Sequence, residues 1–222
     1  MWPMLEIVVE GTVGAGKTAL VEILEKEKGM TGFYEMSDDL ADAILERYYA
    51  DKSRWCLTME LYFLHKRFLQ VRSANQTHKA VMDRSMMGDL VFVRMQKQLG
   101  FLQPIEYKVY ESFFRTMSEI SPTPRLLIYI KCSVKTALER IEKRGRAYEI
   151  NVEKSYWEQL CQFYDEAFME FHNGNVLIIN GDEIDFVENE SDRALVLDAI
   201  DRCVNLKGVH VLNSGSLVCK LD

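Results

Sequence analysis

The chain of 222 residues is acidic, with 27 Lys and Arg against 34 Asp and Glu and a formal net charge of −7. Hydrophobic residues make up 48% and charged residues 27%, which is typical of a globular protein and excludes disordered, collagen-like and coiled-coil chains. The acidity argues against a DNA or RNA polymer as partner, because proteins that bind nucleic acids carry a basic excess. A small anionic ligand stays compatible, since one site can be basic on an acidic protein.

Cysteine usage and hydropathy bear on the compartment. The five cysteines are scattered and include no C-x-x-C pair, which disfavours zinc sites and disulfide frameworks. Residues 1–9 are apolar but carry Glu6 and lack a positively charged start, unlike a signal peptide. No apolar run approaches the roughly 20 residues that span a bilayer. We therefore expect a cytoplasmic protein with no membrane partner.

Short apolar runs alternate with longer stretches of helical spacing. Strands are predicted at residues 5–9, 32–35, 80–82, 126–130 and 176–179. Helices are predicted at residues 17–28, 38–49, 54–73, 88–99, 105–120, 134–143, 153–171 and 191–206. Continuous apolar runs are typical of strands buried on both faces of a parallel sheet. The pattern predicts one α/β domain over residues 1–206, with a parallel sheet of about five strands flanked by helices, and a tail or an extra edge strand at residues 207–222.

The segment that follows the first predicted strand matches the phosphate-binding pattern G-x-x-x-x-G-K-[ST] in full. It consists of Gly11, Thr12, Val13, Gly14, Ala15, Gly16, Lys17 and Thr18. Glycines let backbone N–H groups wrap a phosphate, and the N-terminus of the following helix adds its dipole. We expect Lys17 to reach the β- and γ-phosphates of ATP and the Thr18 hydroxyl to bind Mg²⁺. The alternative is a tight glycine turn beside a surface lysine.

Asp83 and Arg84 follow the third predicted strand. The GTPase patterns D-x-x-G and N-K-x-D are absent from the sequence. An acid at the end of a buried strand beside a phosphate loop can hold Mg²⁺ directly or through water, and an adjacent arginine can neutralise phosphoryl oxygens during transfer. A helix N-cap for Asp83 and a surface ion pair for Arg84 are the alternatives.

A cluster of arginines around Gly145 predicts a short lid. Arg140 and Arg144 lie four residues apart and therefore share one helix face, and Gly145 ends the helix before Arg146. Such a cluster is suited to closing over a triphosphate and excluding water. The alternative is a solvated, charged helix end.

Together these residues resemble the deoxynucleoside kinases that act on deoxycytidine, deoxyguanosine and deoxyadenosine. The resemblance is carried by residues 11–18, 48–55, 62–67, 83–85, 144–146 and 180–186, and it extends to about residue 205. The sequence is most similar to the bacterial deoxyadenosine and deoxyguanosine kinases. The resemblance implies a P-loop fold, a lid near residues 144–152, ATP as donor, Mg²⁺, a deoxynucleoside substrate and a homodimer.

The family also implies roles for single residues. Glu35 matches the carboxylate that accepts the proton of the sugar 5′-hydroxyl, and an acid at the carboxyl end of a strand fits that role. Asp83 is the competing candidate for the base, although we prefer its Mg²⁺ role. The remaining matches are Tyr49 and Glu149 at the sugar 3′-hydroxyl, Arg67 and Asp89 at the base edge, and Asp185 and Phe186 near the adenine of the donor.

Glu60 departs from the family pattern, which has Gln or Asn at this base-reading position. An ionised carboxylate only accepts hydrogen bonds, and guanine offers it two adjacent donors. We therefore expect a purine substrate with deoxyguanosine preferred, unless Glu60 pairs with Arg67 on the same helix. The leading function is ATP-dependent 5′-phosphorylation of a deoxyribonucleoside. The alternatives are a thymidylate-kinase-like nucleoside monophosphate kinase and a regulatory protein that only binds nucleotide.

Overall fold

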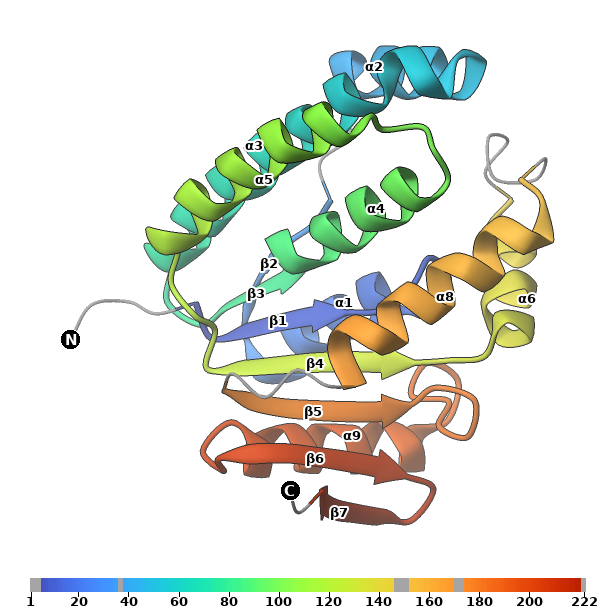
Figure 1. The fold of residues 1–222 in the computed structure, drawn as a ribbon. Coiled ribbons are helices and arrows are strands. Elements are labelled where there is room, and N and C mark those ends of the chain that lie inside the picture. Colours follow the sequence, from blue (N-terminus) through green and yellow to red (C-terminus); the bar gives the residue numbers. More distant parts are fainter. Residues whose placement is uncertain (1–4, 36–37, 146–151, 170–173, 221–222) are drawn as a thin grey trace.

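Seven strands form one sheet, ordered β2-β3-β1-β4-β5-β6-β7, in the computed structural model (Figure 1), which describes residues 5–35, 38–145, 152–169 and 174–220. The strands are β1 Ile7–Glu10, β2 Thr31–Phe33, β3 Ala80–Asp83, β4 Leu126–Lys131, β5 Asn175–Asn180, β6 Gly208–Asn213 and β7 Ser216–Lys220. Strands β1 to β6 pair in parallel, and β7 pairs antiparallel with β6. The carboxyl ends of the parallel strands therefore meet at one edge of the sheet.

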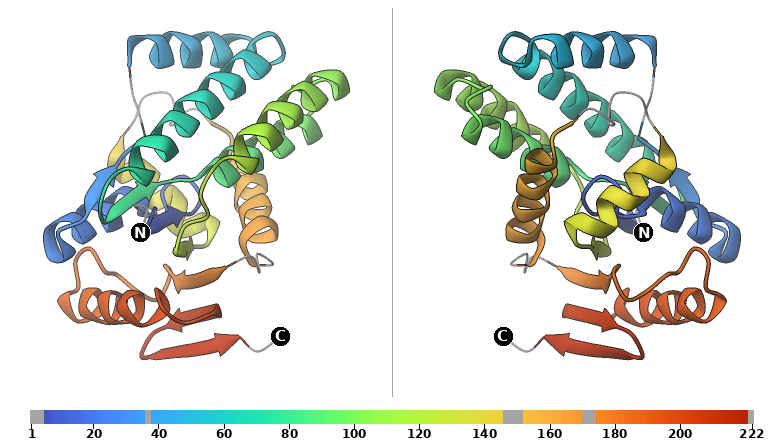
Figure 2. Two further views of the ribbon diagram at one scale, coloured as in Figure 1. Left: turned by 90° about the vertical axis from the view of Figure 1, so that its left-hand side faces the viewer. Right: turned by 90° about the vertical axis from the view of Figure 1, so that its right-hand side faces the viewer.

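Eight helices are described, and each predicted helix is present with its ends shifted by a few residues at most. They are α1 Lys17–Lys28, α2 Asp39–Ala50, α3 Lys52–Asn75, α4 Met86–Gln98, α5 Pro104–Glu119, α6 Val134–Arg144, α8 Lys154–Met169 and α9 Glu190–Cys203. Helices α2 and α3 lie at the opposite end of the molecule from β6 and β7 (Figure 2).

Both faces of the sheet are buried, which explains the continuous apolar runs. On one face Ile7 and Val9 of β1 pack in a core with α1 and α9. On the other face Val8 packs in a core with α3 and α4. Burying one such aliphatic side chain contributes about 1.5–3 kcal/mol to the stability of the fold. A strand with apolar residues on both faces therefore gains this stabilisation from both cores.

The expectation of about five strands is wrong, because residues 208–220 add two strands to the sheet. Of the two possibilities for residues 207–222, the edge-strand interpretation is closer to the structure. β6 pairs in parallel register with β5, from Asn175 opposite Gly208 to Ile179 opposite Leu212. The segment contains His, Asn and Gly, so its sequence carries a weak strand signal. Pairing with β5 supplies the backbone hydrogen bonds that local propensity does not predict.

Asp38 attaches α2 to α3 above the carboxyl edge of the sheet. Its carboxylate caps α2 by accepting from the Ala41 N–H at 2.8 Å. The same carboxylate accepts from the Tyr62 hydroxyl at 2.6 Å and from Lys66 Nζ at 2.7 Å, both on α3. These three hydrogen bonds hold the pKa of Asp38 well below its usual range. Helix α2 is therefore fixed as one wall of the space over β2 and β3.

Candidate active site

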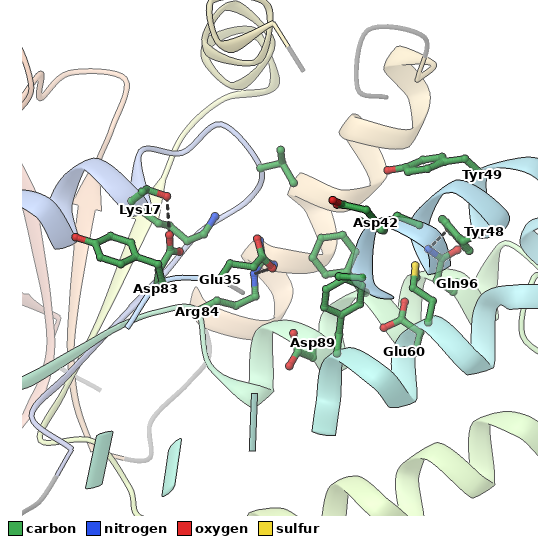
Figure 3. A pocket seen from close by; sticks show the side chains of 18 of the residues that line it. Lys17, Glu35, Asp42, Tyr48, Tyr49, Glu60, Asp83, Arg84, Asp89 and Gln96 are labelled. Atoms are coloured by element: carbon green, nitrogen blue, oxygen red, sulfur yellow. Dashed lines mark hydrogen bonds and ion pairs between the residues drawn. The ribbon is translucent and has the colours of Figure 1, made fainter. Parts of the chain in front are cut away.

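A cavity of about 630 Å³ opens at the carboxyl edge of β1, β2 and β3. A volume of this size is typical of a small-molecule site. The polar residues of its wall are Lys17, Thr18, Tyr34, Glu35, Asp42, Tyr48, Tyr49, Glu60, Asp83, Arg84, Asp89, Gln96, Arg144 and Tyr156. In Figure 3, Lys17 and Asp83 lie at one end, Glu35 and Arg84 in the middle, and Glu60, Gln96 and Tyr48 at the other end.

The glycine-rich loop between β1 and α1 has the backbone geometry of a phosphate cradle. Gly14 has φ 81°, and a Cβ on it would lie 2.5 Å from the carbonyl oxygen of Ala137. Gly16 caps α1 with φ 100°, so the N-terminus of α1 directly follows the loop. Only glycine fits both positions without strain. These two backbone conformations favour the predicted phosphate-binding role of the loop over an ordinary glycine turn.

Lys17 is buried rather than on the surface. Its Nζ donates to the carbonyl oxygens of Gly11 and Thr12, each at 3.0 Å. Burial and, to a smaller extent, the positive charge of Arg84 lower the pKa of Lys17 to about 8. A phosphate in the loop would replace these carbonyl contacts and favour the charged form of the lysine.

Thr18 and Asp83 form an oxygen pair beside the loop. The Thr18 hydroxyl donates to Asp83 Oδ2 at 2.6 Å. Hydroxyl and carboxylate oxygens are ligands that Mg²⁺ prefers, and this ion usually takes few protein ligands and completes its shell with water and phosphate. Across the described residues no cluster of three or more His, Cys, Asp or Glu could hold a metal by itself. The pair therefore fits Mg²⁺ that arrives with a nucleotide.

Glu35 follows β2 and is held by two buried arginines. Its Oε1 accepts from Arg67 Nη2 at 3.2 Å and lies 3.5 Å from Arg84 Nε. The Glu35 side chain is 46% exposed, whereas those of Arg67 and Arg84 are 2% and 5% exposed. The two guanidinium groups therefore fix a carboxylate that remains open to the cavity. A carboxylate held in this way can accept a hydrogen bond from a ligand hydroxyl.

Arg84 is neither exposed nor in a relaxed conformation, so the surface ion-pair interpretation is wrong. Its φ is 80°, which is unfavourable for a residue with a side chain. The guanidinium donates to the Tyr164 hydroxyl of α8 and lies 5.0 Å from the ring centroid of Phe92 on α4. These contacts aim a permanent positive charge at the middle of the cavity.

Glu10, at the end of β1, was missed by sequence reasoning. It is fully buried, and its Oε1 accepts from the Ser85 N–H at 2.6 Å and from the Ser85 hydroxyl at 2.5 Å. Burial raises the pKa of Glu10, and the charge of Arg84 opposes this shift. Glu10 thus fixes the turn that carries Arg84. The available signal was an acid in an apolar strand directly before the first glycine of the loop.

The far end of the cavity brings together two acids and an amide from α3 and α4 and a tyrosine from α2. Glu60 of α3 and Asp89 of α4 are 3% and 5% exposed. Gln96 of α4, a further residue that sequence reasoning missed, donates to the hydroxyl of Tyr48 on α2. Asp89 Oδ2 lies 3.5 Å from Arg67 Nε, which brings the predicted base-edge pair together.

Glu60 does not pair with Arg67, so that sequence-based alternative is wrong. Arg67 instead donates to Gln70 at 3.0 Å and to the carbonyl oxygen of Asp83 at 2.9 Å, in addition to its contacts with Glu35 and Asp89. Glu60 Oε1 has no hydrogen-bond partner within the described ranges.

The remaining predicted residues lie in three different settings. Arg140 donates to the carbonyl oxygens of Ala15 at 2.9 Å and Gly181 at 3.0 Å, so it joins the loop to the turn after β5. Phe186 is buried, and its ring lies 3.4 Å from the position of a Cβ on Gly16. The Asp185 carboxylate accepts from the N–H groups of the two residues that follow Phe186. Tyr49 and Arg144 line the cavity, and Arg146 and Glu149 lie outside the described residues.

A parallel sheet, a glycine-rich loop after β1 and an acid at the end of β3 define the class of P-loop nucleotide-binding proteins. The sequence matches the deoxynucleoside kinase family over residues 7–205. It is 36% identical over 204 residues to a deoxyadenosine kinase of Lactobacillus acidophilus, covering 88% of this chain and 94% of that protein. It is 34% identical to a deoxyguanosine kinase of the same organism, covering 89% and 90%.

A solved structure of a deoxynucleoside kinase has a similar fold. Deoxyadenosine kinase from M. mycoides with bound dATP superposes with a TM-score of 0.78 at 26% identity, covering 88% of this chain and 99% of that one. The chain therefore belongs to the deoxynucleoside kinase family and is a deoxynucleoside kinase. Across the described ranges, no helix is both long and apolar enough to cross a membrane.

Proposed function

We propose that this kinase transfers the γ-phosphoryl group of ATP to the 5′-hydroxyl of a purine deoxyribonucleoside, giving the 5′-monophosphate. The observation that carries the proposal is the position of Glu35. Two buried arginines hold its carboxylate at 3.2 and 3.5 Å in the middle of the cavity, between the phosphate loop and the acidic far end. A hydroxyl hydrogen-bonded there faces the loop, which supports in-line attack on a bound triphosphate.

Each group of the site has a part in this proposal. Glu35 orients the 5′-hydroxyl and accepts its proton as the oxygen attacks phosphorus. Lys17 binds the β- and γ-phosphate oxygens, and Arg84 stabilises negative charge on the transferred group. Thr18 and Asp83 hold Mg²⁺, which when bound neutralises charge on the phosphate oxygens.

The rest of the proposal concerns the groups at the two ends of the cavity. Tyr49 and Glu149 bind the sugar 3′-hydroxyl, and Arg67 and Asp89 bind the base. Arg144 and Arg146 close over the triphosphate in a lid at residues 144–152, whereas Arg140 supports the phosphate loop from the helix before the lid. The kinase domain extends past residue 206, because β6 and β7 continue its sheet. Asp185 and Phe186 support the donor site. A purine substrate is supported by the names of the two Lactobacillus relatives.

The proposal includes a homodimer in the cytoplasm. Ile105, Val109 and Phe113 lie four residues apart along α5 and are 68%, 40% and 50% exposed. This spacing makes one apolar stripe, which supports contact with a second copy of the chain. Sedimentation velocity tests this part: a monomer at micromolar concentration would contradict it. The five cysteines are all unpaired, which supports a reducing compartment.

Steady-state assays with ATP and Mg²⁺ across the four deoxynucleosides and their monophosphates test the function. A nucleoside kinase phosphorylates deoxynucleosides and leaves the monophosphates unreacted. Turnover of deoxythymidine monophosphate alone would favour the thymidylate-kinase alternative. Binding of ATP without turnover of any acceptor would favour a regulatory protein.

A further inference from the structure

The far end of the cavity contains a buried carboxyl group that forms no ion pair with any described residue. Glu60 is 3% exposed and lines the cavity. In the described part of the chain its Oε1 accepts no hydrogen bond and it forms no ion pair. An ionised carboxylate in this position would be buried without a partner, which costs several kcal/mol.

The charged and titratable groups around Glu60 come from every neighbouring element. They are Tyr48 on α2, Cys56 and Arg67 on α3, Arg84 after β3, Asp89 on α4, Tyr110 on α5 and Tyr156 on α8. Of these, only the two arginines are cationic, and both are engaged by Glu35. Asp89 adds negative charge.

Burial and the charge of Asp89 both raise the pKa of Glu60 well above its ordinary value, and Arg84 opposes them more weakly. Asp89 differs because Arg67 lies 3.5 Å away, so burial raises its pKa only to about 6. The two carboxyls therefore differ in environment, because a guanidinium lies 3.5 Å from Asp89 and none pairs with Glu60 among the described residues.

We propose that Glu60 is a neutral carboxylic acid which, together with ionised Asp89, selects a 6-aminopurine base over a 6-oxopurine base. This inference rests on the proposed function, because it concerns the base of the substrate. It reverses the expectation of deoxyguanosine, which required an ionised Glu60.

The hydrogen-bond chemistry favours adenine. A neutral acid presents one donor and one acceptor side by side, which matches the N1 acceptor and the N6 amine of adenine. The second hydrogen of that amine can be donated to Asp89 Oδ2, which accepts no hydrogen bond among the described residues. Guanine carries a carbonyl oxygen at this position, and that oxygen would face the Asp89 carboxylate. A mismatch that leaves a buried polar group unpaired costs about ten- to a hundredfold in kcat/KM.

Carbon-13 NMR on protein labelled at the glutamate carboxyl carbons tests the charge of Glu60 without any substrate. The resonance that disappears in the Glu60→Gln variant identifies Glu60, and circular dichroism checks that the variant is folded. Its position should be that of a neutral acid between about pH 6 and pH 7.5. A position typical of a carboxylate over this range would overturn the proposal.

Kinetics test the base selection. Wild type should phosphorylate deoxyadenosine with a kcat/KM at least about tenfold above that for deoxyguanosine. Glu60→Gln should keep this order, because an amide also offers a donor and an acceptor. Glu46→Gln, which removes an exposed carboxylate of α2, serves as the control. A preference for deoxyguanosine, or an order that reverses in Glu60→Gln, would overturn the proposal. Failure of every deoxynucleoside to react would refute the proposed function and the base selection, while the NMR result would still decide the charge of Glu60.

Discussion

Replacing Glu60 by Gln should change how the stability of the folded protein depends on pH. In the unfolded chain the carboxyl titrates near 4.5, whereas in the folded protein burial and Asp89 raise its pKa well above that value. Between pH 4.5 and the raised pKa the folded state therefore binds up to one more proton than the unfolded state. The free energy of unfolding of the wild type must then fall as the pH rises. The Gln variant lacks this proton and this contribution.

The slope follows from one proton. Each pH unit changes the free energy of a one-proton difference by about 1.4 kcal/mol. Between pH 5 and pH 7 the wild type should therefore lose about 2.7 kcal/mol relative to Glu60→Gln, as long as Glu60 keeps its proton. Other titrating groups, Glu10 included, are present in both proteins and cancel in the difference.

Urea denaturation of both proteins at intervals across this range, under reducing conditions, measures the effect. The Glu46→Gln control should give a curve parallel to that of the wild type, because its carboxylate is exposed on α2. A difference between the wild type and Glu60→Gln that stays constant from pH 5 to pH 7 would refute the reasoning. It would mean that Glu60 ionises equally in the folded and unfolded chains.

Two further predictions concern the phosphate loop and the turn behind it. Gly14→Ala should destabilise the protein by about 2–4 kcal/mol and abolish ATP binding, because its φ is 81° and the new Cβ would lie 2.5 Å from a backbone oxygen. Gly29→Ala is the matched control: it has φ 60° with open space around it, so it should cost about 1 kcal/mol and leave ATP affinity intact by calorimetry. Glu10→Ala should lower the free energy of unfolding in urea by about 1–3 kcal/mol, because the two Ser85 donors lose their acceptor. It should also lower kcat at least about tenfold, because the turn that carries Arg84 loses its support. An unchanged kcat would contradict this role of Glu10.

The central strands of the sheet could be predicted because their sequence signal is local. β1, β4 and β5 are buried on both faces, so each reads as an apolar run in the sequence. β6 and β7 could not be counted in advance. Their segment has only short apolar runs broken by polar residues and glycine, and its place at the sheet edge depends on pairing with β5, which is a contact between distant parts of the chain.

The site residues likewise fall into those that lie in local motifs and those that depend on contacts between distant parts of the chain. Lys17, Asp83 and Glu35 follow strands and sit in short motifs, so the sequence alone pointed to them. Glu10 meets Ser85 across 75 residues, and Gln96 meets Tyr48 across 48. The first contact exists only once β1 pairs with β3, and the second only once α2 and α4 come together. The raised pKa of Glu60 could not be predicted for a similar reason, since it depends on burial that a sequence does not display.

The role of Glu35 is the central claim, and single-turnover phosphorylation of deoxyadenosine by Glu35→Gln tests it most directly. The amide keeps the shape of the side chain but cannot take the proton of the 5′-hydroxyl, and it loses the charge that Arg67 and Arg84 hold. General-base catalysis contributes about 10²–10⁴-fold. We predict a fall in the phosphoryl-transfer rate of this size, with ATP affinity unchanged by calorimetry. A rate within about threefold of the wild type would contradict the account.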